Sequence, residues 1–118
     1  MKRSTMIRLF GILVWCLSAQ ALAHHGWSSY DNQNEQTLTG TVVSAVFEWP
    51  HAEVVIDTGE KQWHVVLAPP TRTRARGLLP ERVIEGATVT VVGYPHRSEA
   101  NELRAERIIV GDDSIELR

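Results

Sequence analysis

The chain has 118 residues, enough for one small domain, and its 12 Lys and Arg against 14 Asp and Glu give a formal charge of −2. Without the first 23 residues, nine basic and fourteen acidic side chains remain, and this acidic balance argues against sequence-independent nucleic-acid binding. The single cysteine, Cys16, lies in those first 23 residues, so the remaining chain has no thiolate for a zinc site, an iron–sulfur cluster or a nucleophile.

The first 23 residues predict a cleavable signal peptide. Three basic residues precede an apolar run over 9–17, and a small-x-small motif ends at Ala23. The apolar run is shorter than the about 20 residues that a membrane-spanning helix needs. The large Trp15 before Cys16 argues against a lipid anchor on that cysteine. We therefore expect a mature protein that begins at His24, lies in the periplasm and has no membrane anchor.

The mature chain is predicted to open with an irregular lead segment over 24–35, which is polar throughout. The Thr- and Val-rich run over 36–47 has no helical period and predicts a long strand, with a bend or bulge at Gly40. Trp49-Pro50 then favours an extended step into the next strand.

Two alternating runs, 51–57 and 62–67, predict a hairpin around a turn at Gly59. The alternation points Trp63 into the core and His64 outward. The remaining chain predicts a short helix, with Thr71 as its N-cap and Gly77 as its stop. The remaining predicted strands are 88–94, 103–110 and a short extended tail over 114–117.

Five strands with a helix between the third and the fourth is the order of the OB-fold, a small Greek-key barrel. We therefore predict an all-β protein in which residues 36–118 form an OB-like barrel. A barrel closes its own edges, which suits a domain of under 100 residues without disulfides. A five-stranded sandwich is the alternative.

Several local motifs resemble a family of uncharacterised exported bacterial proteins, a domain of unknown function. Its members begin the mature chain with Ala-His-His and carry a Leu-x-Gly-x-Val strand, a Pro-His step and a late Gly-rich Val strand. The matching segments here are Ala23-His24-His25, Leu38 to Val42, Glu48-Trp49-Pro50-His51 and Gly86 to Pro95. Members usually have Asn where this chain has Trp49, and many have Glu after the third strand, where this chain has Leu67-Ala68. The resemblance implies an exported β-domain and no particular reaction.

The N-terminal histidine pair suggests a metal chelate. His24 at the start of the mature chain would offer its α-amino and imidazole nitrogens, His25 a third nitrogen, and the deprotonated amide between them a fourth. Copper(II) and nickel(II) favour such tetragonal nitrogen sets. The mature chain has neither Met nor Cys, which argues against copper(I) and leaves copper(II), nickel or zinc. An inert, exposed histidine pair is the alternative.

The hairpin predicts a second group of polar side chains. Its register sets Val55 opposite His64 and places His51, Glu53 and His64 together on the outward face of the second and third strands. OB-folds usually bind ligands on this face. A solvated face on which these groups merely balance charge is the alternative.

Two tryptophans flank histidines: Trp27 follows the N-terminal pair and Trp49 precedes Pro50-His51. We expect their indoles to stack on a ligand. His96, in a polar loop, is expected to be a surface histidine.

These residues predict a non-enzymatic binding protein that holds copper(II) through His24 and His25, with help from His51 or His64. The expected partners are the metal ion or a periplasmic protein, and the mature chain is expected to be a monomer. An interaction module that binds a peptide, glycan or partner protein without metal is the alternative. An oxidative copper enzyme is a third reading, for which the mature chain leaves little room for a substrate platform.

Overall fold

A computed structural model describes residues 26–118 and shows an all-β domain with one short α-helix. The predicted signal peptide and the His24-His25 pair lie outside the described residues. The strands follow the predicted alternation closely, and the helix lies between the third and the fourth. Their bounds are β1 Gln36–Glu48, β2 His51–Asp57, β3 Gln62–Val66, α2 Pro70–Ala75, β4 Thr88–Pro95, β5 Glu102–Val110 and β6 Asp113–Glu116.

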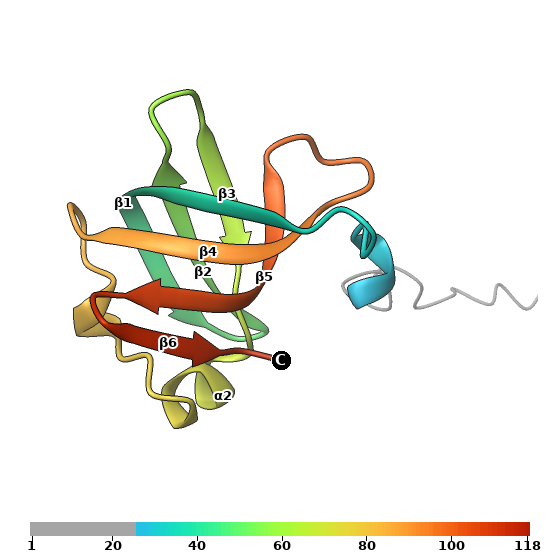
Figure 1. The fold of residues 1–118 in the computed structure, drawn as a ribbon. Helices are drawn as coiled ribbons and strands as arrows, with labels where there is room; N and C mark the ends of the chain where they lie inside the picture. Colours follow the sequence, from blue (N-terminus) through green and yellow to red (C-terminus); the bar gives the residue numbers. More distant parts are fainter. Residues whose placement is uncertain (1–25) are drawn as a thin grey trace, which may run out of the picture.

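The first five strands close into the predicted OB-like barrel (Figure 1). β1 pairs antiparallel with β2 and with β4, β2 with β3, and β4 with β5. A parallel pairing of β3 with β5, from His64↔Glu102 to Val66↔Arg104, closes the ring. The predicted tail forms a sixth strand, β6, which lies antiparallel to β5 and outside the ring. Within the described residues, no helix is both long enough and apolar enough to span a bilayer.

The inward residues of the strands form one core, as the period-two pattern requires. Val54, Ile56, Val65 and Leu103 are buried almost completely, and Trp63 packs with them. The prediction that Trp63 points inward and its neighbour outward is therefore confirmed.

The predicted irregularity in β1 is real, but it is not at Gly40. The register with β2 shifts between Val42 and Ser44, so Val43 is the bulged residue. Gly40 has a different role, because a Cβ on it would lie 2.6 Å from the carbonyl oxygen of Asp57. The glycine lets two backbones approach each other, and the bend follows three residues later.

The predicted cap of the helix is also wrong. α2 begins at Pro70 with Pro69 as the N-cap, two residues before the expected N-cap Thr71. Proline suits the first helical position because its fixed φ is helical. An N–H at that position would have no partner within the helix, so its absence costs nothing. The predicted stop is confirmed: Gly77 has a φ of 105°, which a residue with a side chain rarely adopts.

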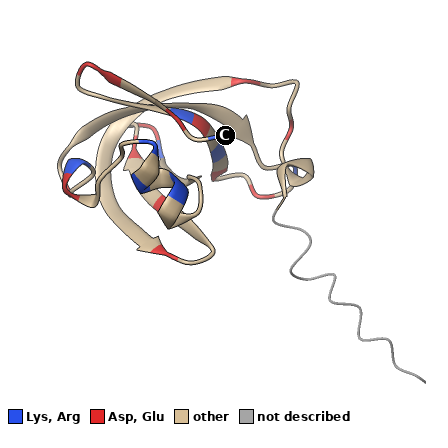
Figure 2. Ribbon diagram, turned by 90° about the horizontal axis from the view of Figure 1, so that it is seen from below, with Lys and Arg blue, Asp and Glu red and all other residues tan. Residues whose placement is uncertain are grey.

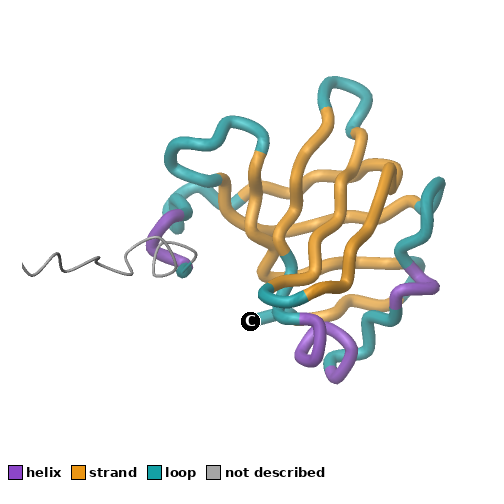
Figure 3. The backbone as a smooth tube through the Cα atoms, turned by 180° about the vertical axis from the view of Figure 1, so that it is seen from behind, coloured by secondary structure: helices purple, strands orange, loops and turns teal. Residues whose placement is uncertain are grey.

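The described part of the lead segment is not a free tail, because it docks on the barrel. A 3-10 turn over Trp27–Ser29 leads to Tyr30, which forms a β-bridge with His96. The backbone N–H of Arg97 donates to the oxygen of Ser29 at 2.9 Å. Figure 3 shows this turn beside the loop that joins β4 to β5.

Candidate binding face

The predicted outward face of β2 and β3 is present. Val55 lies opposite His64 and Glu53 opposite Val66, as the turn predicted. Glu48 lies opposite His51 at the start of β2. The face therefore carries both predicted histidines and the predicted carboxylate, because strand alternation turned them away from the core.

The structure divides these side chains between two hollows. The first, which we call the Tyr30 hollow, measures about 130 Å³ and is lined by Tyr30, Pro50, His51, Glu53, Val66 and Glu102. The second is lined by His64 and by the loop from Ser98 to Glu102. His51 and Glu53 are thus brought together, whereas His64 faces the neighbouring loop. Glu102, on β5, lines both hollows.

Tyr30 is the anchor of the Tyr30 hollow. Its side chain is almost completely buried, and its hydroxyl donates to a carboxylate oxygen of Glu102 at 2.7 Å. Burial raises the pKa of Tyr30 well above its usual value, and the hydrogen bond and negative charge of Glu102 raise it further. The phenol is therefore held as a neutral hydrogen-bond donor.

His96 supports this arrangement from the other side. Its ring lies edge-to-face on Tyr30, with 5.1 Å between the ring centroids. Its Nδ1 accepts the backbone N–H groups of Ser98 at 3.1 Å and Glu99 at 3.0 Å. Its Nε2 lies 3.8 Å from a carboxylate oxygen of Glu102. His96, which was expected to be a surface histidine, is partly exposed, and its imidazole also holds the loop against the wall of the hollow.

Trp27 lies against cationic side chains of the barrel. The guanidinium carbons of Arg104 and Arg118 lie over its ring at 4.4 Å and 4.5 Å from the centroid. Burial lowers the pKa of Arg104, and the positive charges of Arg118 and Arg72 lower it further, while Tyr30 opposes the effect. Figure 2 shows basic residues on α2, which carries Arg72.

The two tryptophans predicted to stack on a ligand differ in their surroundings. Trp27 contacts Tyr30 and Tyr94 edge-to-face as well as the arginines. Trp49 is 81% exposed in the turn between β1 and β2, directly before Pro50 of the hollow. Neither indole lines the Tyr30 hollow itself.

The sequence patterns did not point to Tyr30, Glu102 or His96. Tyr30 lies in the lead segment, for which the sequence predicted no regular structure. Glu102 reaches the face through the parallel pairing of β3 with β5. Residues so distant in the chain leave no local pattern to find.

The carboxylates and imidazoles of the face fall short of a complete metal site. Among residues 26–118, no group of three or more His, Cys, Asp or Glu side chains is arranged to hold a metal ion.

Comparison with known families gives one match. Residues 12–104 match the family of unknown function DUF6152. The chain belongs to the DUF6152 family. The resemblance drawn from the sequence motifs is therefore confirmed, and the match extends from the predicted apolar run into β5 of this DUF6152 protein. No curated protein matches the chain.

Proposed function

We propose that this DUF6152 protein is a non-enzymatic periplasmic binding protein that holds a divalent metal ion, with copper(II) as the preferred ion. His24 and His25 would supply the amino-terminal chelate, and His51 at the Tyr30 hollow would complete it. The single observation that carries the proposal is the docking of Tyr30 in the same hollow as His51 and Glu53.

The docking of Tyr30 supports the proposal by limiting how far the N-terminal pair can lie from the face. His25 precedes Tyr30 by five residues, so the chain allows at most about 18 Å between their Cα atoms. The pair is thus tethered to the end of the barrel that carries His51. Copper(II) suits a set of imidazole and amine nitrogens, and a carboxylate such as Glu53 can add an oxygen ligand.

The structure also favours His51 over His64 as the barrel's contribution. His51 shares its hollow with the lead segment, whereas His64 shares its own with the β4–β5 loop. His64 is therefore a matched control: both are histidines on the outward face of the same hairpin.

The test is a copper(II) titration of mature protein that begins at His24. Calorimetry measures the affinity and the number of ions bound, and electron paramagnetic resonance reports the ligands. We expect one copper(II) ion in a nitrogen-rich tetragonal site. An extra alanine before His24 should weaken binding strongly, because it separates the amine from the imidazole. His51→Ala should weaken binding about tenfold, equal to about 1.4 kcal/mol, and His64→Ala should leave it unchanged.

Each other result has a clear meaning. Equal binding by the extended and the native N-terminus would overturn the chelate. Binding that His51→Ala leaves unchanged would separate the chelate from the barrel. An absence of copper(II) binding would leave the interaction module as the function to pursue.

A further inference from the structure

A groove beside β1 lies on a different surface from the Tyr30 hollow. One part, of about 360 Å³, is lined mainly by apolar residues of β1 and of the segment before β4, among them Val43, Ala45, Phe47, Pro80 and Ile84. A second part, of about 530 Å³, continues it past Thr41 toward Asp57 and Gly59. The two parts share Val43 and Glu85, and we call them together the β1 groove.

The wall of this groove is an unpaired strand edge. The pairing of β1 with β4 ends at Thr41↔Thr88, and Val42 makes the last backbone bonds on that side, to Ala87 and Gly86. From Ser44 to Glu48, β1 pairs only with β2 among the described strands, and the bulged Val43 before them pairs with no strand. The free edge is six residues long, roughly 20 Å at strand spacing, which matches an ordinary β-strand.

The surface around the edge is unusually apolar. The five exposed large hydrophobic side chains of the described residues all lie on β1, on the turn after it or on the segment that faces it: Val43, Val46, Trp49, Leu79 and Ile84. Two of them, Val43 and Ile84, line the β1 groove itself. Isolated exposed apolar residues are common, but exposed apolar side chains along a free strand edge are typical of an interaction site.

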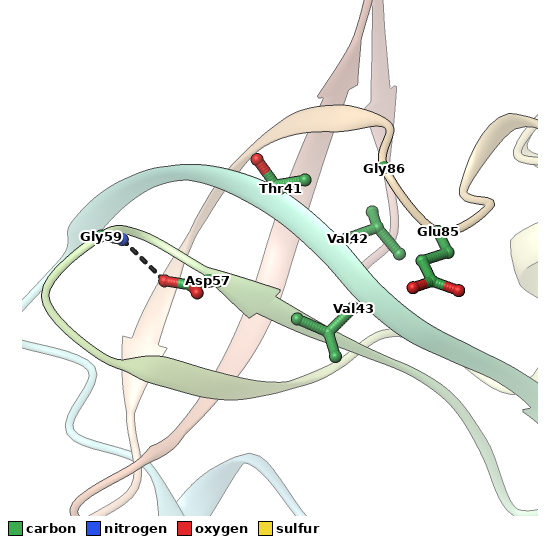
Figure 4. A pocket seen from close by; sticks show the side chains of 7 residues that line it. All are labelled: Thr41, Val42, Val43, Asp57, Gly59, Glu85 and Gly86. Atoms are coloured by element: carbon green, nitrogen blue, oxygen red, sulfur yellow. Dashed lines mark hydrogen bonds between the residues drawn. The ribbon is translucent and has the colours of Figure 1, made fainter.

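The charges of the groove are all negative. Asp57 and Glu85 line the part drawn in Figure 4, where β1 runs between the β2–β3 turn and the Glu85-Gly86 segment, and no Lys or Arg lines either part. Asp57 already accepts the backbone N–H of Gly59 at 2.8 Å. Within residues 26–118, the carboxylate of Glu85 has neither a hydrogen bond nor an ion pair.

The far end of the edge carries a second carboxylate, Glu48, which also has no ion pair or hydrogen bond within the described part of the chain. Arg74 lies near this end of the edge, with its guanidinium carbon 5.8 Å from the centroid of the Phe47 ring. An apolar edge with a free carboxylate at each end complements an apolar segment with a basic residue at each end.

These charges disfavour a second copy of the chain as the occupant. Two β1 edges related by a twofold axis would place Val43 of one copy opposite Glu48 of the other. Glu85 lies beside Val43, so each such dimer would bring Glu48 and Glu85 of different copies together twice. Like charges in those positions oppose pairing.

We propose that the β1 groove binds an extended segment of another protein by adding it as a strand to the Val43–Glu48 edge. Backbone hydrogen bonds to β1 would align the segment, and its alternate side chains would enter the apolar groove. Lys or Arg at its two ends would face Glu85 and Glu48. This site does not depend on metal binding at the Tyr30 hollow.

The test uses a fluorescent heptapeptide of alternating Val and Thr with Lys at both ends. We expect it to bind the mature protein and to shift the backbone amide signals of Val43–Glu48 in a nuclear magnetic resonance titration. A peptide with Glu at both ends should bind at least about tenfold more weakly, because it meets the carboxylates. N-methylation of the alternate amides that face β1 should abolish binding.

Protein variants give the matching controls. Glu85→Lys should weaken binding of the Lys peptide about tenfold, whereas Glu99→Lys, in the loop at the other hollow, should leave it unchanged. Equal binding of the Lys and Glu peptides, or no shift in the Val43–Glu48 amides, would overturn the proposal. Shifts of these amides with protein concentration, without peptide, would assign the edge to a second copy and would also overturn it.

Discussion

The Tyr30 hollow and the β1 groove represent opposite ways to build a surface. The hollow is made by segments far apart in the chain that fix one another, with Tyr30 hydrogen-bonded to Glu102 across 72 positions. The groove follows one strand edge and its facing segment, and large apolar side chains remain exposed along it. A stable pocket and an available strand edge can therefore occupy one small barrel, because the residues that stabilise the hollow are not the residues that remain exposed along the groove.

The largest expected effect is on the crossing that supports the hollow. Gly93 of β4 passes so close to β5 that a Cβ would collide with the carbonyl oxygen of Arg104. Gly93→Ala should lower the free energy of unfolding by about 3 kcal/mol, measured by urea denaturation. Gly59→Ala is the control: it has a φ of 91° and no neighbour within 4 Å, and should cost about 1 kcal/mol. Equal costs would show that the crossing relaxes easily.

The next effect concerns the phenol of the hollow. Tyr30→Phe keeps the ring and removes the hydroxyl, so the Glu102 carboxylate loses its donor. We expect a loss of about 2 kcal/mol in the free energy of unfolding at pH 7. Tyr94→Phe is the matched variant, because that hydroxyl bonds Glu106 at 3.1 Å and Glu35 at 3.3 Å nearer the surface. It should cost less, and the opposite order would contradict the anchoring role of Tyr30.

A third prediction uses alkaline pH. The pKa of Tyr30 is raised in the folded protein, chiefly by burial, so the fold favours its neutral form. The stabilisation is fully present below the unfolded value of about 10 and is lost as pH rises through the folded value. The free energy of unfolding should fall by up to about 1.4 kcal/mol per pH unit above pH 10. Tyr30→Phe should make the free energy of unfolding depend less on pH in this range. An unchanged pH dependence would mean that another group causes the loss of stability.

The smallest effect is expected at the groove. Ile84 is 61% exposed, so Ile84→Ser should change the free energy of unfolding by less than about 0.5 kcal/mol. The neighbouring Val83 is buried, and Val83→Ser should destabilise the protein clearly in the same thermal or urea unfolding series. A large cost at Ile84 would mean that the groove residue serves folding instead of docking.

The sequence predicted the parts of this molecule that depend on local pattern. The alternation of 51–57 and 62–67 determined which side chains face the core, and the turn at Gly59 determined the hairpin register. No local pattern marked the bulge at Val43. The neighbours of Tyr30 depend on how distant strands close the barrel, because Glu102 reaches the hollow through the parallel pairing of β3 with β5. Sequence reasoning therefore found His51 and Glu53 but not the tyrosine and glutamate that complete their hollow.

The hydrogen bonds of His96 determine which of its two ring nitrogens carries the proton. Two backbone N–H groups point at Nδ1, so that nitrogen carries no proton and the neutral ring has its hydrogen on Nε2, toward Glu102. One nitrogen is occupied by the backbone and the other is protonated, so the ring offers a metal ion no lone pair. The fold therefore holds His96 as a structural histidine beside the Tyr30 hollow, with neither ring nitrogen available to join a ligand set.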